Sequence, residues 1–215
     1  RYLEEGVSNP TTKEEYAGEI KQQNEKGTEV QLAAVQTGTW YKIIGTRYWD
    51  NKKLEKNEQY SEALKYFRKS LEYDPDNEIL YYNVAICTGI LSHLVDPSET
   101  DKKMFYLKTC EEAYKNALAI NPKYTRALYG IAVVYDMEYS QPEMAIPHLE
   151  KLITIETKNI DAMVLLAQCY YETLQFDRAI ELYDRIIETS NIEKRKELAQ
   201  QTKEQVLRAK EEYSK

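Results

Sequence analysis

The sequence of 215 residues is poor in the residue types that interrupt regular structure or build metal sites. It contains 7 glycines and 6 prolines, too few for a loop-rich or low-complexity chain. It contains only 2 histidines, His93 and His148, which lie far apart with no cysteine or carboxylate at ligand spacing. Neither a metal site nor a cofactor is therefore expected.

Cysteine is also scarce. Cys87, Cys110 and Cys169 make an odd number, and no CxxC pair occurs, so we expect three free thiols rather than a disulfide framework. Reduced thiols favour the cytoplasm. An exported or lipid-anchored periplasmic form stays open as an alternative, because the sequence starts at Arg1 and a leader could precede it.

Long apolar runs, positive net charge and catalytic motifs are absent as well. No run of about 18 apolar residues occurs, so a membrane-spanning segment is not expected. The net charge of −7 argues against a general nucleic-acid binder, which needs a basic face to displace counterions. The sequence has no glycine-rich phosphate loop, nucleophile elbow or paired-histidine motif, so we expect no enzyme.

The composition that remains is typical of a soluble helical protein. Hydrophobic residues make up 42% and charged residues 30% of the chain. Its 19 tyrosines outnumber its 3 phenylalanines. A tyrosine ring packs at a helix contact while its hydroxyl stays in water, which suits many amphipathic helices.

The stretch 159–191 predicts two helices joined by a short turn near 174–176. On each helix, apolar residues three and four apart form a stripe along one face. The first helix carries Met163, Leu166, Ala167 and Tyr170, and the second carries Ala179, Tyr183 and Ile186. Ala167 and Ala179 fall where two antiparallel helices would come closest. This order and spacing resembles the tetratricopeptide repeat, a helix–turn–helix unit of 34 residues.

Related patterns recur three times upstream. They include Tyr41, Gly45 and Ala63 in one unit, Val84, Ala85 and Ala117 in the next, and Leu128, Ala132 and Ala145 in the third. The resemblance implies an all-α, right-handed superhelical array of about four units with capping helices at both ends. The predicted boundaries are 1–37 for the N-terminal segment and capping helices, 38–77, 78–124, 125–159 and 160–191 for the units, and 192–215 for a C-terminal capping helix.

Local sequence features add detail to these boundaries. Two capping helices are expected in 1–37, one from Thr11 or Thr12 to about residue 24 and one from Thr28 onward. We expect a break between them at Lys26-Gly27 and a kink at Gly38. Extra residues at 50–57 and 89–103 lengthen the first two units. Pro97 marks the expected turn in the second of these segments.

The resemblance also implies a site, because in this family the first helices of successive units line a concave groove that binds partners. The corresponding positions are Lys42, Thr46, Trp49, Ile79, Tyr82, Asn83, Ile86, Arg126, Tyr129, Val133, Gln168 and Tyr171. Their mixture of aromatic, aliphatic and polar side chains suits a peptide or helix.

Some family members hold a peptide carboxylate with a five-residue clamp. Lys42, Asn83 and Arg126 stand at three clamp positions, whereas Thr46 and Gly130 depart from the pattern. The sequence therefore predicts a non-catalytic interaction module whose protein or peptide partner carries an acidic or carboxylate group. Three alternatives stay open: an oligomerising scaffold, an exported component that binds a solute or lipid in a closed pocket, and a groove filled by the N-terminal segment.

Overall fold

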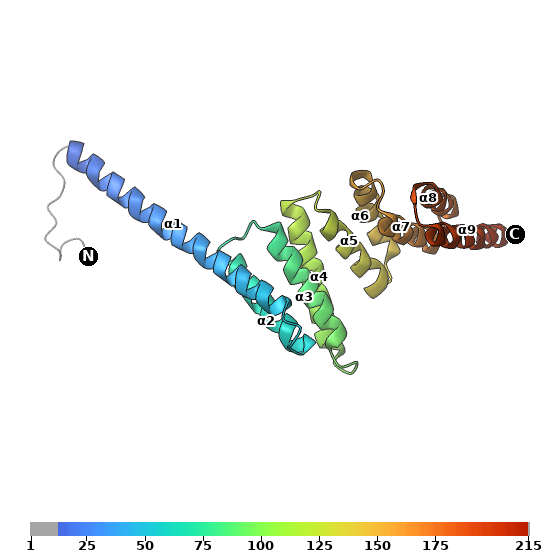
Figure 1. Cartoon of the computed structure of the whole chain (residues 1–215), viewed down its shortest axis with the longest axis horizontal. Coiled ribbons are helices and arrows are strands. Elements are labelled where there is room, and N and C mark those ends of the chain that lie inside the picture. The colour runs from blue at the N-terminus through green and yellow to red at the C-terminus, as the bar shows by residue number, and fades with distance from the viewer. Residues whose placement is uncertain (1–12, 215) are drawn as a thin grey trace.

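The computed structural model describes residues 13–214, and in that range the chain is helical with no strand (Figure 1). The elements are α1 (Lys13–Trp49), α2 (Lys56–Leu71), α3 (Glu78–Leu94), α4 (Thr100–Ile120), α5 (Thr125–Val133), the π-helical turn η1 (Val134–Glu138), α6 (Pro142–Ile155), α7 (Ile160–Glu172), α8 (Phe176–Thr189) and α9 (Glu193–Tyr213). The predicted all-α class is confirmed.

Successive helices pack on one another in a row, as Figure 1 shows from α1 at one end to α9 at the other. Antiparallel pairs form from α1 with α2, α3 with α4, α5 and η1 with α6, and α7 with α8, and α9 covers α8. Each unit therefore contacts only its neighbours, which is the arrangement of a helical solenoid. The predicted C-terminal helix is present as α9, and the turn predicted at Pro97 separates α3 from α4.

Small side chains occupy the closest helix contacts. Ala167 of α7 and Ala179 of α8 are fully buried, as the stripe pattern predicted. The cysteines are buried on helices and form no disulfide with one another. Burial raises the pKa of Cys87 and Cys110 to about 12, so both thiols stay protonated at neutral pH.

Side chains at the helix ends explain several boundaries. Asn77 accepts hydrogen bonds from the backbone N–H groups of Ile79 and Leu80, at 3.0 and 3.1 Å, and so caps α3. Asn159 caps α7 by accepting one hydrogen bond, from the backbone N–H of Ala162 at 3.0 Å. Pro142 begins α6, where its missing N–H removes no helical bond.

The N-terminal helix corrects the sequence prediction. α1 runs without interruption through Gly27 and Gly38, so the expected break and kink are wrong. Gly38 instead permits close approach to the end of α2 and the turn after it, since a Cβ there would lie 2.8 Å from the Cβ of Tyr73. The Ser70 hydroxyl donates to the Gly38 carbonyl at 2.8 Å at the same contact. The helix start expected at Thr11 or Thr12 lies outside the described residues.

Because α1 has 37 residues and α2 has 16, the first part of α1 projects beyond the helix it packs on (Figure 1). The unit boundaries given above remain predictions.

Candidate partner-binding surface

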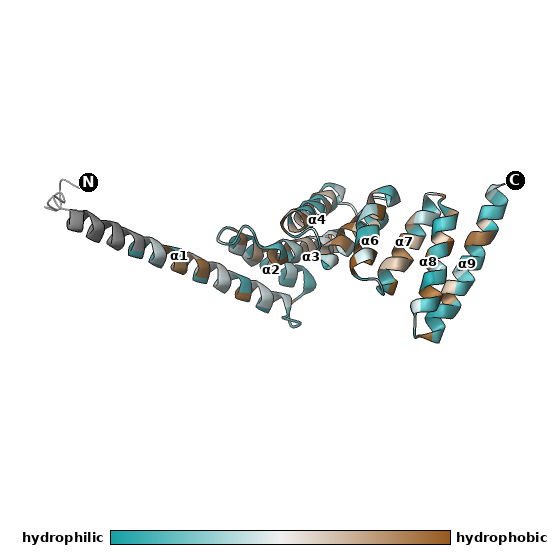
Figure 2. Ribbon diagram, turned by 90° about the horizontal axis from the view of Figure 1, so that it is seen from above, coloured by the Kyte–Doolittle hydropathy of each residue, from teal (hydrophilic) through white to brown (hydrophobic). Residues whose placement is uncertain are grey.

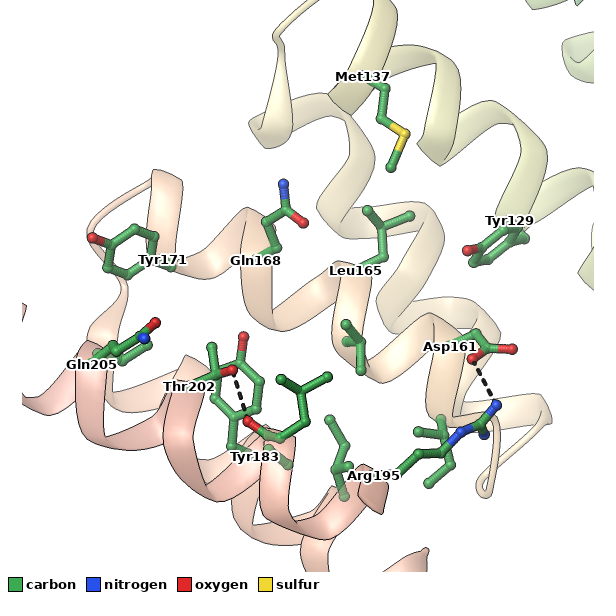
Figure 3. A pocket seen from close by; sticks show the side chains of 16 residues that line it. Tyr129, Met137, Asp161, Leu165, Gln168, Tyr171, Tyr183, Arg195, Thr202 and Gln205 are labelled. Atoms are coloured by element: carbon green, nitrogen blue, oxygen red, sulfur yellow. Dashed lines mark hydrogen bonds and ion pairs between the residues drawn. The ribbon is translucent and has the colours of Figure 1, made fainter. Parts of the chain in front are cut away.

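A cavity of about 640 Å³ lies between α7 and α9, with α8 at its base (Figure 3). We call it the α7–α9 trough. Its lining consists of Tyr129, Met137, Ile160, Asp161, Val164, Leu165, Gln168, Tyr171, Tyr183, Ile186, Arg195, Leu198, Ala199, Thr202, Gln205 and Val206. α7 contributes from residue 160 to 171, and α9 from 195 to 206, so both walls extend for twelve residues.

The trough has a buried apolar base and a partly exposed rim. Leu165, Ile186 and Val206 are buried at the base. Val164 of α7 and Leu198 of α9 also line the trough and remain 43% and 63% exposed, so we place them at its rim. Large apolar side chains that are exposed around a concavity mark a surface suited to a partner rather than to water.

The charged side chains of the trough lining neutralise each other. Asp161 and Arg195 are its only ionised members, and their side chains pair at 3.7 Å across one end (Figure 3). Both are solvent-exposed, so this pair contributes little to stability. Between the two walls, Gln168, Thr202 and Gln205 supply uncharged polar groups (Figure 3).

A smaller cavity of about 270 Å³ adjoins the trough and shares Tyr129 and Asp161 with it. We call it the Arg126 crevice. It is lined by Tyr82, Thr125, Arg126, Tyr129, Leu152, Glu156, Asn159 and Asp161. Three of the residues predicted from sequence, Tyr82, Arg126 and Tyr129, therefore lie together here.

Acidic neighbours moderate the positive charge of Arg126. Glu156 accepts a hydrogen bond from the Asn159 side chain at 2.6 Å. Hydrogen bonds from Thr125 and Asn159, together with the charge of Arg126, lower the pKa of the Glu156 carboxyl, which stays ionised. Burial and the nearby Asp161 carboxylate raise the pKa of Tyr129. The crevice is thus mixed in charge rather than a basic pocket.

Gly130 shows why one position of the clamp pattern is unfilled. A Cβ on Gly130 would lie 2.6 Å from the Cε1 atom of Tyr114, and closer still to its Cζ and hydroxyl. Tyr114 is buried, and its ring contacts Tyr82 with a centroid separation of 6.2 Å. Tyr82 also packs edge-on against Tyr124 at 5.4 Å. An aromatic ring therefore occupies the space that a basic side chain at position 130 would need.

The other predicted groove residues are distributed differently. Gln168 and Tyr171 line the α7–α9 trough. Lys42 lines a separate cavity of about 140 Å³ beside Tyr73 and Asp74, so it shares no cavity with Arg126 among those described here. Thr46, Trp49, Ile79, Asn83, Ile86 and Val133 line none of these three cavities. The Trp49 ring packs edge-on against Tyr60 and Phe67.

The α9 wall is the part of the site that the sequence prediction missed. The sequence predicts only a capping helix over 192–215, yet Leu198, Ala199 and Val206 form one side of the trough. The signal that the sequence offers is a thin apolar stripe through Leu198 and Val206, near one helix face. Proximity to α7 could not be inferred from that stripe alone.

A buried carboxylate lies next to the trough. Asp136 in η1 accepts a hydrogen bond from the Cys169 thiol at 3.4 Å. Burial raises the pKa of Asp136. The hydrogen bond from the Cys169 thiol lowers this pKa, and the neighbouring Glu172 carboxylate raises it further. The following residue, Met137, reaches the trough (Figure 3). A π-helical turn at such a place is typical of functional regions.

Within residues 13–214, the part of the chain that the structure describes, no group of three or more His, Cys, Asp or Glu side chains is placed to hold a metal ion. None of the helices described is both long and apolar enough to cross a membrane.

The row of antiparallel helix pairs, with small residues at their contacts and a concave cavity at one end, defines a helical-repeat protein. Comparison with known proteins gives the family. Tetratricopeptide-repeat models match residues 136–191 and residues 54–77. These two segments carry tetratricopeptide repeats, and the matches support placing the chain in that family.

Relatives in sequence are distant. The chain is 27% identical over 139 residues to mouse DnaJ homolog subfamily C member 7, and this match covers 63% of the chain and 28% of that protein. It is 22% identical over 159 residues to a TPR repeat-containing protein of Borreliella burgdorferi, covering 74% of the chain and 65% of the relative. The chain thus matches less than two thirds of the length of each.

Solved structures agree on the fold. MamA from Desulfovibrio magneticus RS-1, residues 41 to the end, is similar with a TM-score of 0.59 at 17% identity, covering 80% of this chain and 94% of MamA. YrrB, described as a TPR protein with an unusual peptide-binding site, has a TM-score of 0.50 at 19% identity and covers 61% of each chain. At these identities the likeness shows the fold alone.

Proposed function

We propose that the chain is a non-catalytic protein-interaction module that binds an amphipathic helix of a partner protein in the α7–α9 trough. The observation that carries this proposal is a concave, apolar cavity of about 640 Å³ whose rim exposes Val164 and Leu198. Solenoids of this kind use their extended concave surfaces for binding. The peptide-binding site named for YrrB is a precedent for peptide binding on this fold.

The dimensions favour a helix as the ligand. Twelve residues of α7 and twelve of α9 form the walls, which corresponds to a length of about 17 Å and about three helical turns. An amphipathic helix would place side chains at positions i, i+3, i+4 and i+7 against the apolar base. Gln168, Thr202 and Gln205 would then meet polar groups along its edges.

The Arg126 crevice extends this surface toward α3. Since Tyr129 and Asp161 belong to both cavities, a ligand longer than the trough continues past Arg126 and Tyr82. An acidic or carboxylate group of the partner would pair with Arg126 there, in competition with Glu156. We therefore expect this contact to contribute specificity more than affinity, and to weaken as salt is raised.

Binding is tested with helical peptides selected from a display library on the intact chain, followed by fluorescence titration. Leu198→Glu places a charge at the trough rim, so it should weaken binding by about tenfold or more, as expected when an apolar anchor is lost. The matched control is Leu207→Glu, on the same helix at 39% exposure and outside the trough lining. Equal affinities for the two variants would contradict the proposal.

A further inference from the structure

The outer face of α1 is apolar and has no neighbour in the described part of the chain that buries it. Leu32 and Trp40 are 57% and 64% exposed, and Ile43 lies on the same side of the helix. We call these three residues the α1 outer face. The opposite side of α1, including Gly38, packs on α2, so the helix is apolar on two sides.

Charge is also missing from this part of α1. Residues 30–41 contain no Asp, Glu, Lys or Arg, although 30% of the whole chain is charged. Figure 2 shows hydrophobic segments along α1 where it projects past α2. A projecting helix with an uncharged, exposed apolar face is typical of a segment that packs against another helix surface.

The α1 outer face and the α7–α9 trough match in length and in charge. Leu32 to Ile43 covers twelve residues, about 17 Å of helix, the same length as each wall of the trough. Ionised groups are absent from the outer face, and those of the trough lining, Asp161 and Arg195, pair with each other. Burying one against the other would leave no unpaired charge behind.

We infer that the α1 outer face of one copy of the chain docks in the α7–α9 trough of a second copy, in a head-to-tail contact. This inference rests on the proposed helix-binding function of the trough and names a ligand for it. The two features lie at opposite ends of the array, so one chain does not satisfy both by itself (Figure 1). A heterologous contact of this type leaves a free trough and a free α1 at the ends and continues into longer assemblies.

The competing arrangement is a symmetric dimer in which α1 pairs with α1. Such a dimer would cover the α1 outer face and leave the trough open to solvent. The head-to-tail contact covers both apolar surfaces, and mutation distinguishes the two arrangements.

The first experiment measures sedimentation velocity of the full chain from micromolar to millimolar concentration. The wild type should assemble as concentration rises, while Leu32→Glu on α1 and Leu198→Glu in the trough should each stay monomeric at concentrations where the wild type associates. The controls are Val30→Glu, which is 70% exposed and about 160° round α1 from Leu32 if each residue turns the helix by about 100°, and Leu207→Glu on α9. Both controls should assemble like the wild type.

The second experiment mixes the two defective variants. Leu32→Glu retains an intact trough and Leu198→Glu retains an intact α1, so the mixture should form a dimer although neither variant associates alone. A Leu198→Glu variant that still dimerises, or a mixture that remains monomeric, would overturn the head-to-tail contact. The first of these results would favour pairing of α1 with α1.

Failure of this inference is distinguishable from failure of the proposed function. If the wild type remains monomeric at every concentration, but peptides selected on the chain bind and lose affinity in Leu198→Glu, the trough binds a helix other than α1. A synthetic peptide covering residues 28–46 gives the direct comparison. It should bind the wild type and Leu207→Glu, and bind Leu198→Glu at least about tenfold more weakly, the loss of one buried anchor.

Discussion

Replacing Gly130 by alanine should destabilise the protein, because Gly130 contacts the ring of Tyr114, although helix propensity alone would predict stabilisation. Replacing glycine by alanine inside a helix normally stabilises it by about 1 kcal/mol. At position 130 the new Cβ would lie 2.6 Å from Tyr114 Cε1, far inside van der Waals contact. Tyr114 is buried between neighbouring helices, so its ring has little space to move.

Overpacking of this kind typically costs about 1–3 kcal/mol. After subtraction of the gain in propensity, Gly130→Ala should lower the free energy of unfolding by up to about 2 kcal/mol, and should leave it about 1–3 kcal/mol below that of a glycine-to-alanine change without a clash. For a chain of this size each kcal/mol corresponds to about 2–4 °C in melting temperature. The control is Gly89→Ala in α3, where a Cβ would meet Cys110 Sγ at 3.4 Å, an ordinary contact, and should be neutral or stabilising.

The assay is urea unfolding followed by circular dichroism, with a double-mutant cycle. In a Tyr114→Leu background the ring is absent, so adding Gly130→Ala should no longer destabilise the protein. A Gly130→Ala variant as stable as Gly89→Ala would refute the reasoning. So would an unchanged penalty after the ring is removed, because the clash would then not be its cause.

Three further predictions concern packing, charge and backbone conformation. Ala179→Leu should overpack the contact of α7 with α8 and lower stability by about 1–3 kcal/mol, whereas Gln200→Ala on α9 should change it little; equal melting temperatures would contradict the close contact. The folded-state pKa of Asp136 is raised, so the contribution of Asp136 to stability declines as pH rises above about 4. The free energy of unfolding of Asp136→Asn, measured in urea, should therefore increase relative to that of the wild type between about pH 4 and 7. A decrease in this difference over the same range would show that the Cys169 hydrogen bond dominates. Leu174 has a φ of 61° in the turn after α7, so Leu174→Gly should relieve strain of about 1 kcal/mol, and a lower melting temperature would show that its side chain matters more.

Periodicity was sufficient to predict the fold class, because stripes such as the one through Leu166 and Tyr170 recur along the chain and each needs a neighbouring helix to bury it. It was insufficient for α1. Glycine normally weakens a helix, yet Gly38 lies within one because the contact with Tyr73 has no room for a side chain. Local propensity does not contain that tertiary reason.

The candidate site was predictable on α7 and only partly elsewhere. Gln168 and Tyr171 were predicted because in this family the first helix of each unit faces the concave side; both line the trough, and their role in binding stays a prediction. Leu198 was not among the predicted residues, since its place in the trough depends on how α9 packs against α8. Tyr114 and Gly130 lie on two different helices, so the lack of space for a side chain at position 130 becomes clear only from the three-dimensional structure.

A helical ligand between α7 and α9 should shield the backbone amides of both helices from solvent. The decisive measurement is hydrogen exchange by mass spectrometry on the full chain, with and without a selected peptide at a concentration that just saturates the wild type. Exchange should slow in residues 160–171 and 195–206 of the wild type, and should slow clearly less there in Leu198→Glu at the same peptide concentration. Protection confined to other helices, with these two segments unchanged in the wild type, would contradict a ligand at this position.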